Sequence, residues 1–320
     1  MPAQRLVTGT WRWPAQLCDN WFEGATGSGA AIESGGAMSS TAPEPARAET
    51  VVLIHGMWMT PLSWEHWADR YTRQGHHVLA PAWPGLEAEP EQLRRDPSPL
   101  RGLSITDVVD HYDKIIRGLE QPPIIIGHSF GGLYTQLLLN RGLGAAGVAL
   151  DTAAPKGVLR LPYSTLRAAW PALNNPANLK KETPLTEDQF HWCFTNALSR
   201  EESNAVYRRY YIPGSARPFF QAGLANFNPK AVTKVDYRNP ARPPLLLLTG
   251  SKDRISPPSV NRANLKKQQQ APSATEYREY PGRCHFPGQD GWEEVADYAL
   301  SWTVEHARSS AADRRGPSSA

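Results

Sequence analysis

Pro123-Ile-Ile-Ile-Gly-His-Ser-Phe-Gly-Gly132 is the most informative segment of the chain. Its first half is a continuous apolar run, which is typical of a strand buried on both faces of a parallel sheet. Its second half contains a G-x-S-x-G pattern, followed by a helical pattern over residues 130–141. Glycines on both sides of Ser129 permit a very sharp turn, because they have no Cβ to collide with neighbouring backbone. The segment therefore predicts a serine hydroxyl raised above the carboxyl edge of a sheet, at the N-terminus of a helix.

Strand and helix patterns alternate on both sides of this segment. Buried strands are expected at 50–55, 76–80, 123–127, 147–151, 245–250 and 276–280, and helices at 62–73, 104–119, 130–141, 259–270 and 292–306. Such alternation predicts an α/β fold with a doubly wound, mostly parallel sheet and right-handed crossovers. Residues 156–238 break the alternation and are rich in aromatic residues. We expect this insertion to form a helical cap over one end of the sheet.

The expected domain organisation follows from these patterns. Residues 50–155 and 239–307 form the α/β core, and residues 156–238 form the cap. Residues 1–49 are rich in Gly, Ala, Ser and Pro, so we expect a disordered extension, with Met38 as an alternative start of translation. Residues 308–320 are expected to be a disordered tail. We expect no secretory signal and no transmembrane helix, because no apolar run has the required length.

Composition excludes several classes of function. The formal net charge of +3 is a weak bias without a basic stripe, so nucleic acid is not an expected partner. The three cysteines are too few and too scattered for a disulfide framework, which favours a reducing, cytoplasmic location. His76 and His77 are adjacent and would point to opposite faces of a strand, so they cannot bind one metal ion together. We therefore expect no metal, no cofactor and no membrane partner.

These motifs give the chain a resemblance to the α/β-hydrolase superfamily over residues 50–307. In that superfamily the catalytic triad runs Ser, acid, His in chain order. The resemblance implies Ser129 as nucleophile, His285 as base and Asp253 as the carboxylate that orients the base. Asp253 follows the 245–250 strand, and His285 lies between the last strand and the last helix. Asp151, at the end of the strand after the Ser129 helix, is a rival for the carboxylate because some members use that place.

A second family feature is His55-Gly-Met-Trp58, at the end of the first strand. The resemblance implies that the backbone amides of Met57 and Phe130 form an oxyanion hole. These two N–H groups would stabilise the negative oxygen that forms when a carbonyl becomes tetrahedral. We expect His55 to support the loop by hydrogen bonding, because one acid–base histidine is sufficient.

Aromatic residues near the expected site suggest an apolar substrate. We predict Trp58, His128, Trp170 and Phe194 as substrate-binding residues, although the cap's aromatics can equally form its own core. A serine nucleophile argues against the dehalogenases and epoxide hydrolases of the superfamily, which use Asp. The expected function is hydrolysis of small-molecule carboxylic esters through an acyl-enzyme. Thioester, lactone or amide cleavage, a catalytically silent receptor or scaffold, and a homodimer all stay open.

Overall fold

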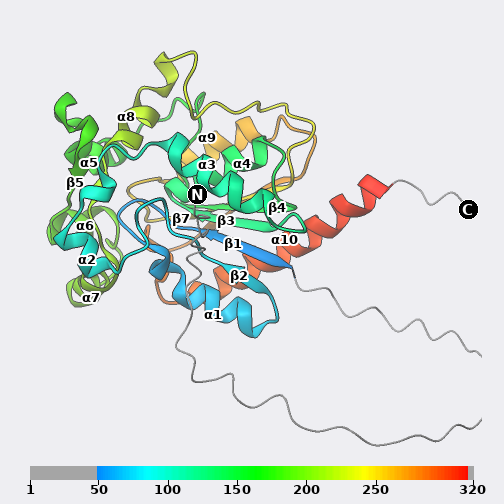
Figure 1. Cartoon of the computed structure of the whole chain (residues 1–320), viewed down its shortest axis with the longest axis horizontal. Helices are drawn as coiled ribbons and strands as arrows, with labels where there is room; N and C mark the ends of the chain where they lie inside the picture. Colours follow the sequence, from blue (N-terminus) through cyan, green and yellow to red (C-terminus); the bar gives the residue numbers. More distant parts are fainter. Residues whose placement is uncertain (1–48, 316–320) are drawn as a thin grey trace, which may run out of the picture. The chain divides into compact units, whose positions relative to one another are not determined.

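The central sheet of the computed structural model has six parallel strands in the order β2-β1-β3-β4-β7-β8 (Figure 1). The structure describes residues 49–315, with side chains to residue 308. The strands are β1 Thr50–Ile54, β2 His77–Leu79, β3 Ile124–His128, β4 Ala146–Leu150, β7 Leu245–Gly250 and β8 Thr275–Tyr280. The α/β fold with a doubly wound parallel sheet is therefore confirmed. All strand carboxyl ends meet at one edge, where Ser129, Asp253 and His285 lie.

Helices cover both faces of the sheet because alternate residues of each buried strand point to opposite faces. Val51 and Leu53 of β1 pack with side chains of α1 and α10, whereas Val52 and Ile54 pack with α3 and α4. Figure 1 shows α3, α4 and α9 on one face and α1 and α10 on the other. These helices are α1 Glu65–Arg73, α3 Ile105–Arg117, α4 Phe130–Asn140, α9 Pro258–Gln268 and α10 Trp292–Arg315. Both faces are thus buried, as expected from the continuous apolar runs.

The cap lies between β4 and β7 in the chain and covers the carboxyl edge of the sheet (Figure 1). Its helices are α5 Tyr163–Leu173, α6 Glu187–Cys193, α7 Arg200–Tyr210 and α8 Arg217–Gly223, with short 3-10 turns η3 Pro176–Lys180 and η4 Ala225–Phe227. Thr186 and Ser199 cap α6 and α7 with reciprocal hydrogen bonds to Gln189 and Glu202. These capping boxes give hydrogen-bond partners to backbone N–H groups that would otherwise be unpaired at the start of α6 and α7. Each helix therefore begins at a defined residue.

Several elements differ from the expectations. A two-stranded antiparallel sheet, β5 Glu182–Thr183 with β6 Gly214–Ser215, lies inside the otherwise helical cap. The helix expected at 62–73 begins as a 3-10 turn, η1 Pro61–Trp64, before α1, and two short helices that were not expected, α2 Pro90–Arg95 and η2 Ser98–Leu100, precede α3. Helix α10 continues to Arg315, beyond the expected core boundary at residue 307. The expected extension over residues 1–49 lies outside the described residues except for Glu49, and so does the tail beyond Arg315.

Candidate active site

Ser129 occupies the turn between β3 and α4 in a left-handed backbone conformation, with φ 58° and ψ −119°. A residue other than glycine held at such angles costs of order 1–3 kcal/mol, and this strain is typical of functional positions. Hydrogen bonds hold the turn in place. The Ser129 N–H donates to the carbonyl of Leu150 at 2.9 Å, and its carbonyl accepts from the N–H groups of Leu133 and Ala153. Strand β4 and helix α4 therefore fix the serine from both sides.

Two glycines allow the close backbone contacts that this turn requires. A Cβ atom on Gly127 would lie 2.1 Å from the Gly131 carbonyl oxygen. A Cβ atom on Gly131 would likewise lie 2.1 Å from the carbonyl oxygen of Ile54 in β1. Both distances are far below van der Waals contact, so no larger residue fits without moving backbone. The glycine pattern therefore also seats helix α4 against strand β1.

His285 and Asp253 meet at the carboxyl edge of the sheet, after β8 and β7. The Nδ1 atom of His285 lies 2.8 Å from Oδ2 of Asp253, and both side chains are fully buried. The other carboxylate oxygen, Oδ1, accepts hydrogen bonds from the N–H groups of Ile255 at 2.7 Å and Ser256 at 3.0 Å. Since a carboxylate only accepts, this network assigns the proton to Nδ1 and leaves Nε2 as an acceptor.

The Nε2 atom of His285 is buried and has no hydrogen-bond partner among the described residues. Its ring lies beside the serine turn, with its centroid 4.6 Å from that of His128, the residue before Ser129. No hydrogen bond joins Nε2 to the Ser129 hydroxyl in the described part of the chain. Contacts of this kind often tighten only when substrate binds. The site thus holds an unpaired buried base next to a strained serine.

Asp151 lies nearby, but no hydrogen bond joins it to His285 in the described part of the chain. Its Oδ1 atom accepts a hydrogen bond of 2.7 Å from the N–H of Gly250, so it connects the ends of β4 and β7. Burial, together with the negative charge of Asp253, raises the pKa of Asp151 well above its usual value. The structure therefore pairs His285 with Asp253 and leaves Asp151 as a neighbouring carboxyl group that favours its neutral form.

His128, Asp151 and His285 form the one group of metal-ligand residues in the described chain, with candidate atoms within 4.8 Å of one another. Hydrogen bonds already engage the two rings. Nε2 of His128 donates to the carbonyl of His285 at 2.8 Å, and Nδ1 of His285 faces Asp253. The other nitrogen of each ring, Nδ1 of His128 and Nε2 of His285, has no hydrogen-bond partner among the described residues.

His55 stabilises the loop after β1 as a neutral ring. Its Nδ1–H donates to the Gly56 carbonyl at 3.0 Å, and its Nε2 accepts from the N–H of Trp83 at 3.3 Å. Burial lowers the pKa of His55 to about 4. The ring also stacks on Trp83, with centroids 4.7 Å apart. This is the supporting role expected for His55, and the contribution of Trp83 was not predicted from the sequence.

Gly56 brings this loop against the serine turn. A Cβ atom at Gly56 would lie 2.8 Å from the Cβ of Ser129. The next residue, Met57, and the first residue of α4, Phe130, are the two predicted oxyanion donors. Neither N–H donates a hydrogen bond to another described group. The Phe130 amide lies at the N-terminus of α4, where unpaired N–H groups attract negative charge, and the Met57 amide belongs to the loop after β1; both suit a developing oxyanion.

Trp58 joins the same loop to the cap. It has a left-handed backbone with φ 66°. Its indole Nε1–H donates to the carbonyl of Thr183 at 3.1 Å, and its carbonyl accepts from the N–H of Ile212 at 3.0 Å. Its ring lies 5.2 Å from that of Phe219 in α8. Phe219 and Thr183 were not predicted as site residues, because no motif surrounds them in the sequence.

The other predicted substrate-binding residues occupy different positions. His128 and Phe194 are buried against His285, and the Phe194 ring lies 4.8 Å from the imidazole in an edge-to-face arrangement. Trp170 is mostly exposed on α5 and lines a cavity of about 260 Å³ between α5 and α6. Cys193 of α6 also lines that cavity and is buried, as are Ala168 and Leu185. The structure thus brings three of the four residues close to the triad or its loop, and places Trp170 in the cap.

Comparisons with known proteins agree with this architecture. A sequence profile described as "Alpha/beta hydrolase family" matches residues 51–298. Similar solved structures include a monoacylglycerol lipase from Paleococcus ferrophilus, which is 21% identical with a TM-score of 0.57. The match covers 80% of this chain and 94% of the lipase chain. No curated protein sequence matches the chain significantly.

Two further solved structures have the same fold at low identity. Polyneuridine aldehyde esterase is 16% identical with a TM-score of 0.58, covering 80% of this chain and all of its own. The thioesterase domain from the curacin biosynthetic pathway is 17% identical with a TM-score of 0.52. The match covers 80% of this chain and 92% of the thioesterase chain. At these identities the likeness concerns the fold.

Proposed function

Because the chain belongs to the alpha/beta hydrolase family, we propose that it is a serine hydrolase that cleaves carboxylic esters through an acyl-enzyme at Ser129. The observation that carries this proposal is the buried Asp253–His285 pair, whose free Nε2 lies beside the strained serine turn. A serine hydroxyl becomes a good nucleophile only when a base takes its proton. The pair supplies that base in one fixed tautomer.

The proposed reaction has two halves. His285 accepts the Ser129 proton while the serine oxygen attacks the ester carbonyl, and Asp253 stabilises the imidazolium that forms. The carbonyl oxygen becomes negative and accepts hydrogen bonds from the amides of Met57 and Phe130. His285 then gives its proton to the leaving alcohol, and the acyl group stays on Ser129. In the second half, water attacks the acyl carbonyl while His285 takes its proton. His285 then returns this proton to the Ser129 oxygen as the acyl bond breaks, and the carboxylic acid leaves.

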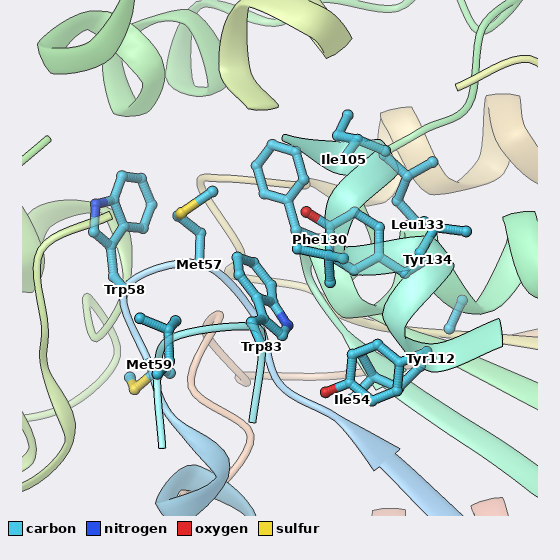
Figure 2. Close-up of a cluster of buried hydrophobic side chains, with 14 of the residues drawn as sticks. Ile54, Met57, Trp58, Met59, Trp83, Ile105, Tyr112, Phe130, Leu133 and Tyr134 are labelled. Atoms are coloured by element: carbon cyan, nitrogen blue, oxygen red, sulfur yellow. The ribbon is translucent and has the colours of Figure 1, made fainter. Parts of the chain in front are cut away.

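The surroundings of the serine favour apolar acyl groups of small to medium size. Figure 2 shows Met57, Trp58 and Phe130 in one cluster of buried side chains, together with Trp83 from the loop after β2. Phe219 of the cap lies 5.1 Å from the Phe130 ring. Such a lining offers an ester little beyond apolar contact and the two amide donors. Several of the similar solved structures are esterases by name, which agrees with this substrate class.

Access to the serine requires movement of the cap. Ser129 is 3% exposed and His285 is fully buried. Trp58 connects the oxyanion loop to the cap sheet, so opening of the cap and preparation of the oxyanion hole are mechanically linked. The free, buried thiols of Cys193 and Cys284 suit a reducing compartment, and we therefore place the enzyme in the cytoplasm.

Labelling with a fluorophosphonate probe and turnover of p-nitrophenyl esters test the proposal directly. We expect the probe to label Ser129, and Ser129→Ala to lose labelling and at least about 10⁴-fold of kcat while staying folded. Ser301→Ala, on the exposed side of α10, is the control and should keep both. If the probe labels Ser129 but the protein turns over only thioesters or amides, the substrate class is a thioester or an amide rather than a carboxylic ester. Full ester turnover by Ser129→Ala would refute the proposal, and an unreactive folded wild type would favour a silent receptor.

A further inference from the structure

The cap exposes large apolar side chains on its outside. The most exposed are Leu159, Leu161, Tyr163, Trp170, Leu224 and Phe227. Phe227 is 86% exposed, Leu159 80% and Tyr163 75%, so these side chains lie almost entirely in solvent. Isolated exposed apolar residues are ordinary, but neighbouring ones mark an interaction surface.

These residues are neighbours through two sets of contacts. On α5, the exposed residues Tyr163, Leu166 and Trp170 follow a three- and four-residue spacing, so they share one face of the helix. The loop before α5 is tied to the segment after α8 by Asn226. Its side chain accepts from the Gly157 N–H at 2.7 Å and donates to the Val158 carbonyl at 3.2 Å.

Helices α5 and α8 also pack against each other in the cap (Figure 1). We call the exposed side chains of residues 159–170 and 224–227 the cap outer face. It unites two stretches that are more than fifty residues apart in the chain.

Basic residues are frequent in the stretches that build the cap outer face and in η3, which packs against α5 and α8, and these stretches contain no acidic residue. Between Asp151 and Glu182, and between Glu202 and Asp236, the sequence contains no Asp or Glu. The same stretches contain ten basic residues, which are Lys156, Arg160, Arg167, Lys180, Lys181, Arg208, Arg209, Arg217, Lys230 and Lys234. Arg160, Lys180 and Lys230 are exposed and form no ion pair in the described part of the chain. The face therefore combines apolar side chains with unpaired positive charge.

This combination discriminates between two occupants. A second copy docked face to face would bring like charges together, which disfavours a symmetric dimer through this surface. An anionic lipid surface offers both complements, because its headgroups attract the basic residues and its acyl region accepts the apolar ones. Trp and Tyr, both present here, are enriched at such interfaces. We propose that the cap outer face adsorbs the protein to anionic lipid membranes.

This proposal replaces the expectation from the sequence that the protein has no membrane partner. No helix of the described residues has the length and apolar character needed to cross a bilayer. Adsorption needs no spanning segment, only apolar area and charge at one surface. It is also independent of catalysis, so it stands or falls separately from the proposed esterase activity.

Vesicle co-sedimentation of full-length Ser129→Ala protein is the test, because this variant cannot hydrolyse the lipid. We expect binding to vesicles of equal parts phosphatidylcholine and phosphatidylglycerol at low salt. We also expect release by added salt, because screening weakens the attraction. Binding to pure phosphatidylcholine should be weaker by tenfold or more, on the basis of about fivefold per basic contact.

Two added pairs of substitutions identify the surface. Leu159→Ser with Phe227→Ser should lower partitioning at least about tenfold, because both apolar anchors are lost. Lys180→Gln with Lys181→Gln should lower it by up to about 30-fold. The matched control is Lys266→Gln with Lys267→Gln, an exposed lysine pair near the C-terminus of α9, where the chain turns toward the start of β8 and away from the cap. It should bind as the parent does. Circular dichroism melting checks that each protein is folded.

Several results would overturn the proposal. One is that the protein stays in the supernatant with anionic vesicles at low salt. Another is that it binds neutral vesicles as strongly as anionic ones. Equal losses in the α9 control would mean that total charge acts rather than this face. A dimer in light scattering that the Leu159/Phe227 change dissociates would assign the face to a second copy. None of these results depends on turnover of an ester.

Discussion

Asp253 and Asp151 lie at neighbouring strand ends, and their hydrogen-bonding surroundings differ. Asp253 receives three hydrogen bonds, from His285 and from two backbone N–H groups. Asp151 accepts a hydrogen bond from the N–H of Gly250 and also interacts with the Asp253 carboxyl group, and burial together with the negative charge of Asp253 raises its pKa, which favours the neutral carboxylic acid. A neutral acid resembles a carboxamide in shape and in its ability to both donate and accept hydrogen bonds.

This difference predicts opposite responses to the same substitution. Asp253→Asn should lower kcat by about 10⁴-fold, because an amide no longer holds the imidazole in its working tautomer. Asp151→Asn should stay within about tenfold of the wild type, because an amide oxygen can still accept from Gly250. Steady-state kinetics on one p-nitrophenyl ester, with circular dichroism for folding, measures both. Equal losses would show that the two carboxyl groups orient His285 together.

At the residue scale, the sequence predicted the residues that motifs surround. Ser129 has its glycines, and His285 and Asp253 each follow a clear strand. The sequence favoured Asp253 over Asp151 through the family resemblance, but a choice on geometry was out of reach, because both residues end strands at the same sheet edge. It depends on which oxygen faces Nδ1 at 2.8 Å. Trp83 was missed because it lies in a loop and reaches His55 only through the fold.

The loop after β1 and the β5–β6 sheet of the cap are joined through Trp58, and Met57 also lies against β6. Its indole N–H satisfies the buried carbonyl of Thr183, and a Cβ on Gly214 of β6 would lie 2.9 Å from the same nitrogen. Trp58→Phe removes the donor but keeps a ring beside Phe219. One buried carbonyl without its partner costs about 1–3 kcal/mol.

We expect Trp58→Phe to lower kcat about tenfold with little change in KM, because the loop positions the Met57 amide in the transition state rather than the bound ester. The loss should be smaller than the 10²–10³ typical for deleting an oxyanion donor itself. The control is Trp192→Phe, the same change in the cap on a residue that contacts Arg167 and Arg254 instead. A similar drop in kcat for the control would mean general damage to the cap and would contradict the linkage.

At the element scale, the sequence predicted helices and strands accurately where a clear pattern of buried residues runs through the element. The run at Leu245–Gly250 and the periodicity at Ile105–Arg117 gave their elements to within a residue or two, because both are dominated by one burial pattern. Strands β5 and β6 have two residues each, too few for alternation to show. Their pairing depends on contacts with Met57 and Trp58, which no local pattern encodes.

For the whole molecule, the fold class followed from the sequence, but the distribution of charge did not. A net charge of +3 seemed evenly spread along the chain. Once folded, two acid-free stretches meet at the cap outer face, because Asn226 ties one to the other. Charge that is dilute along the sequence thus becomes concentrated on one surface.

Buried histidines at the heart of the molecule should make its stability sensitive to acid. Burial lowers the pKa of His55 to about 4, and it also places the pKa of His128 well below the usual value. His55 has no room for a second proton, because its Nε2 already accepts from the N–H of Trp83. Unfolding releases both rings to water, where a histidine pKa is about 6.5.

Between pH 6.5 and 4 the unfolded chain therefore binds more protons than the native protein, so the free energy of unfolding must fall as the pH falls. For His55 alone the loss approaches about 3 kcal/mol near pH 4, and it is absent above pH 7. Urea unfolding of wild type and His55→Gln at matched pH values measures this difference, because carboxylates that also titrate contribute equally to both proteins. We expect His55→Gln to be less stable at pH 7 and to lose about 2–3 kcal/mol less than the wild type on acidification. Parallel pH profiles would contradict a neutral, doubly hydrogen-bonded His55 beneath the oxyanion loop.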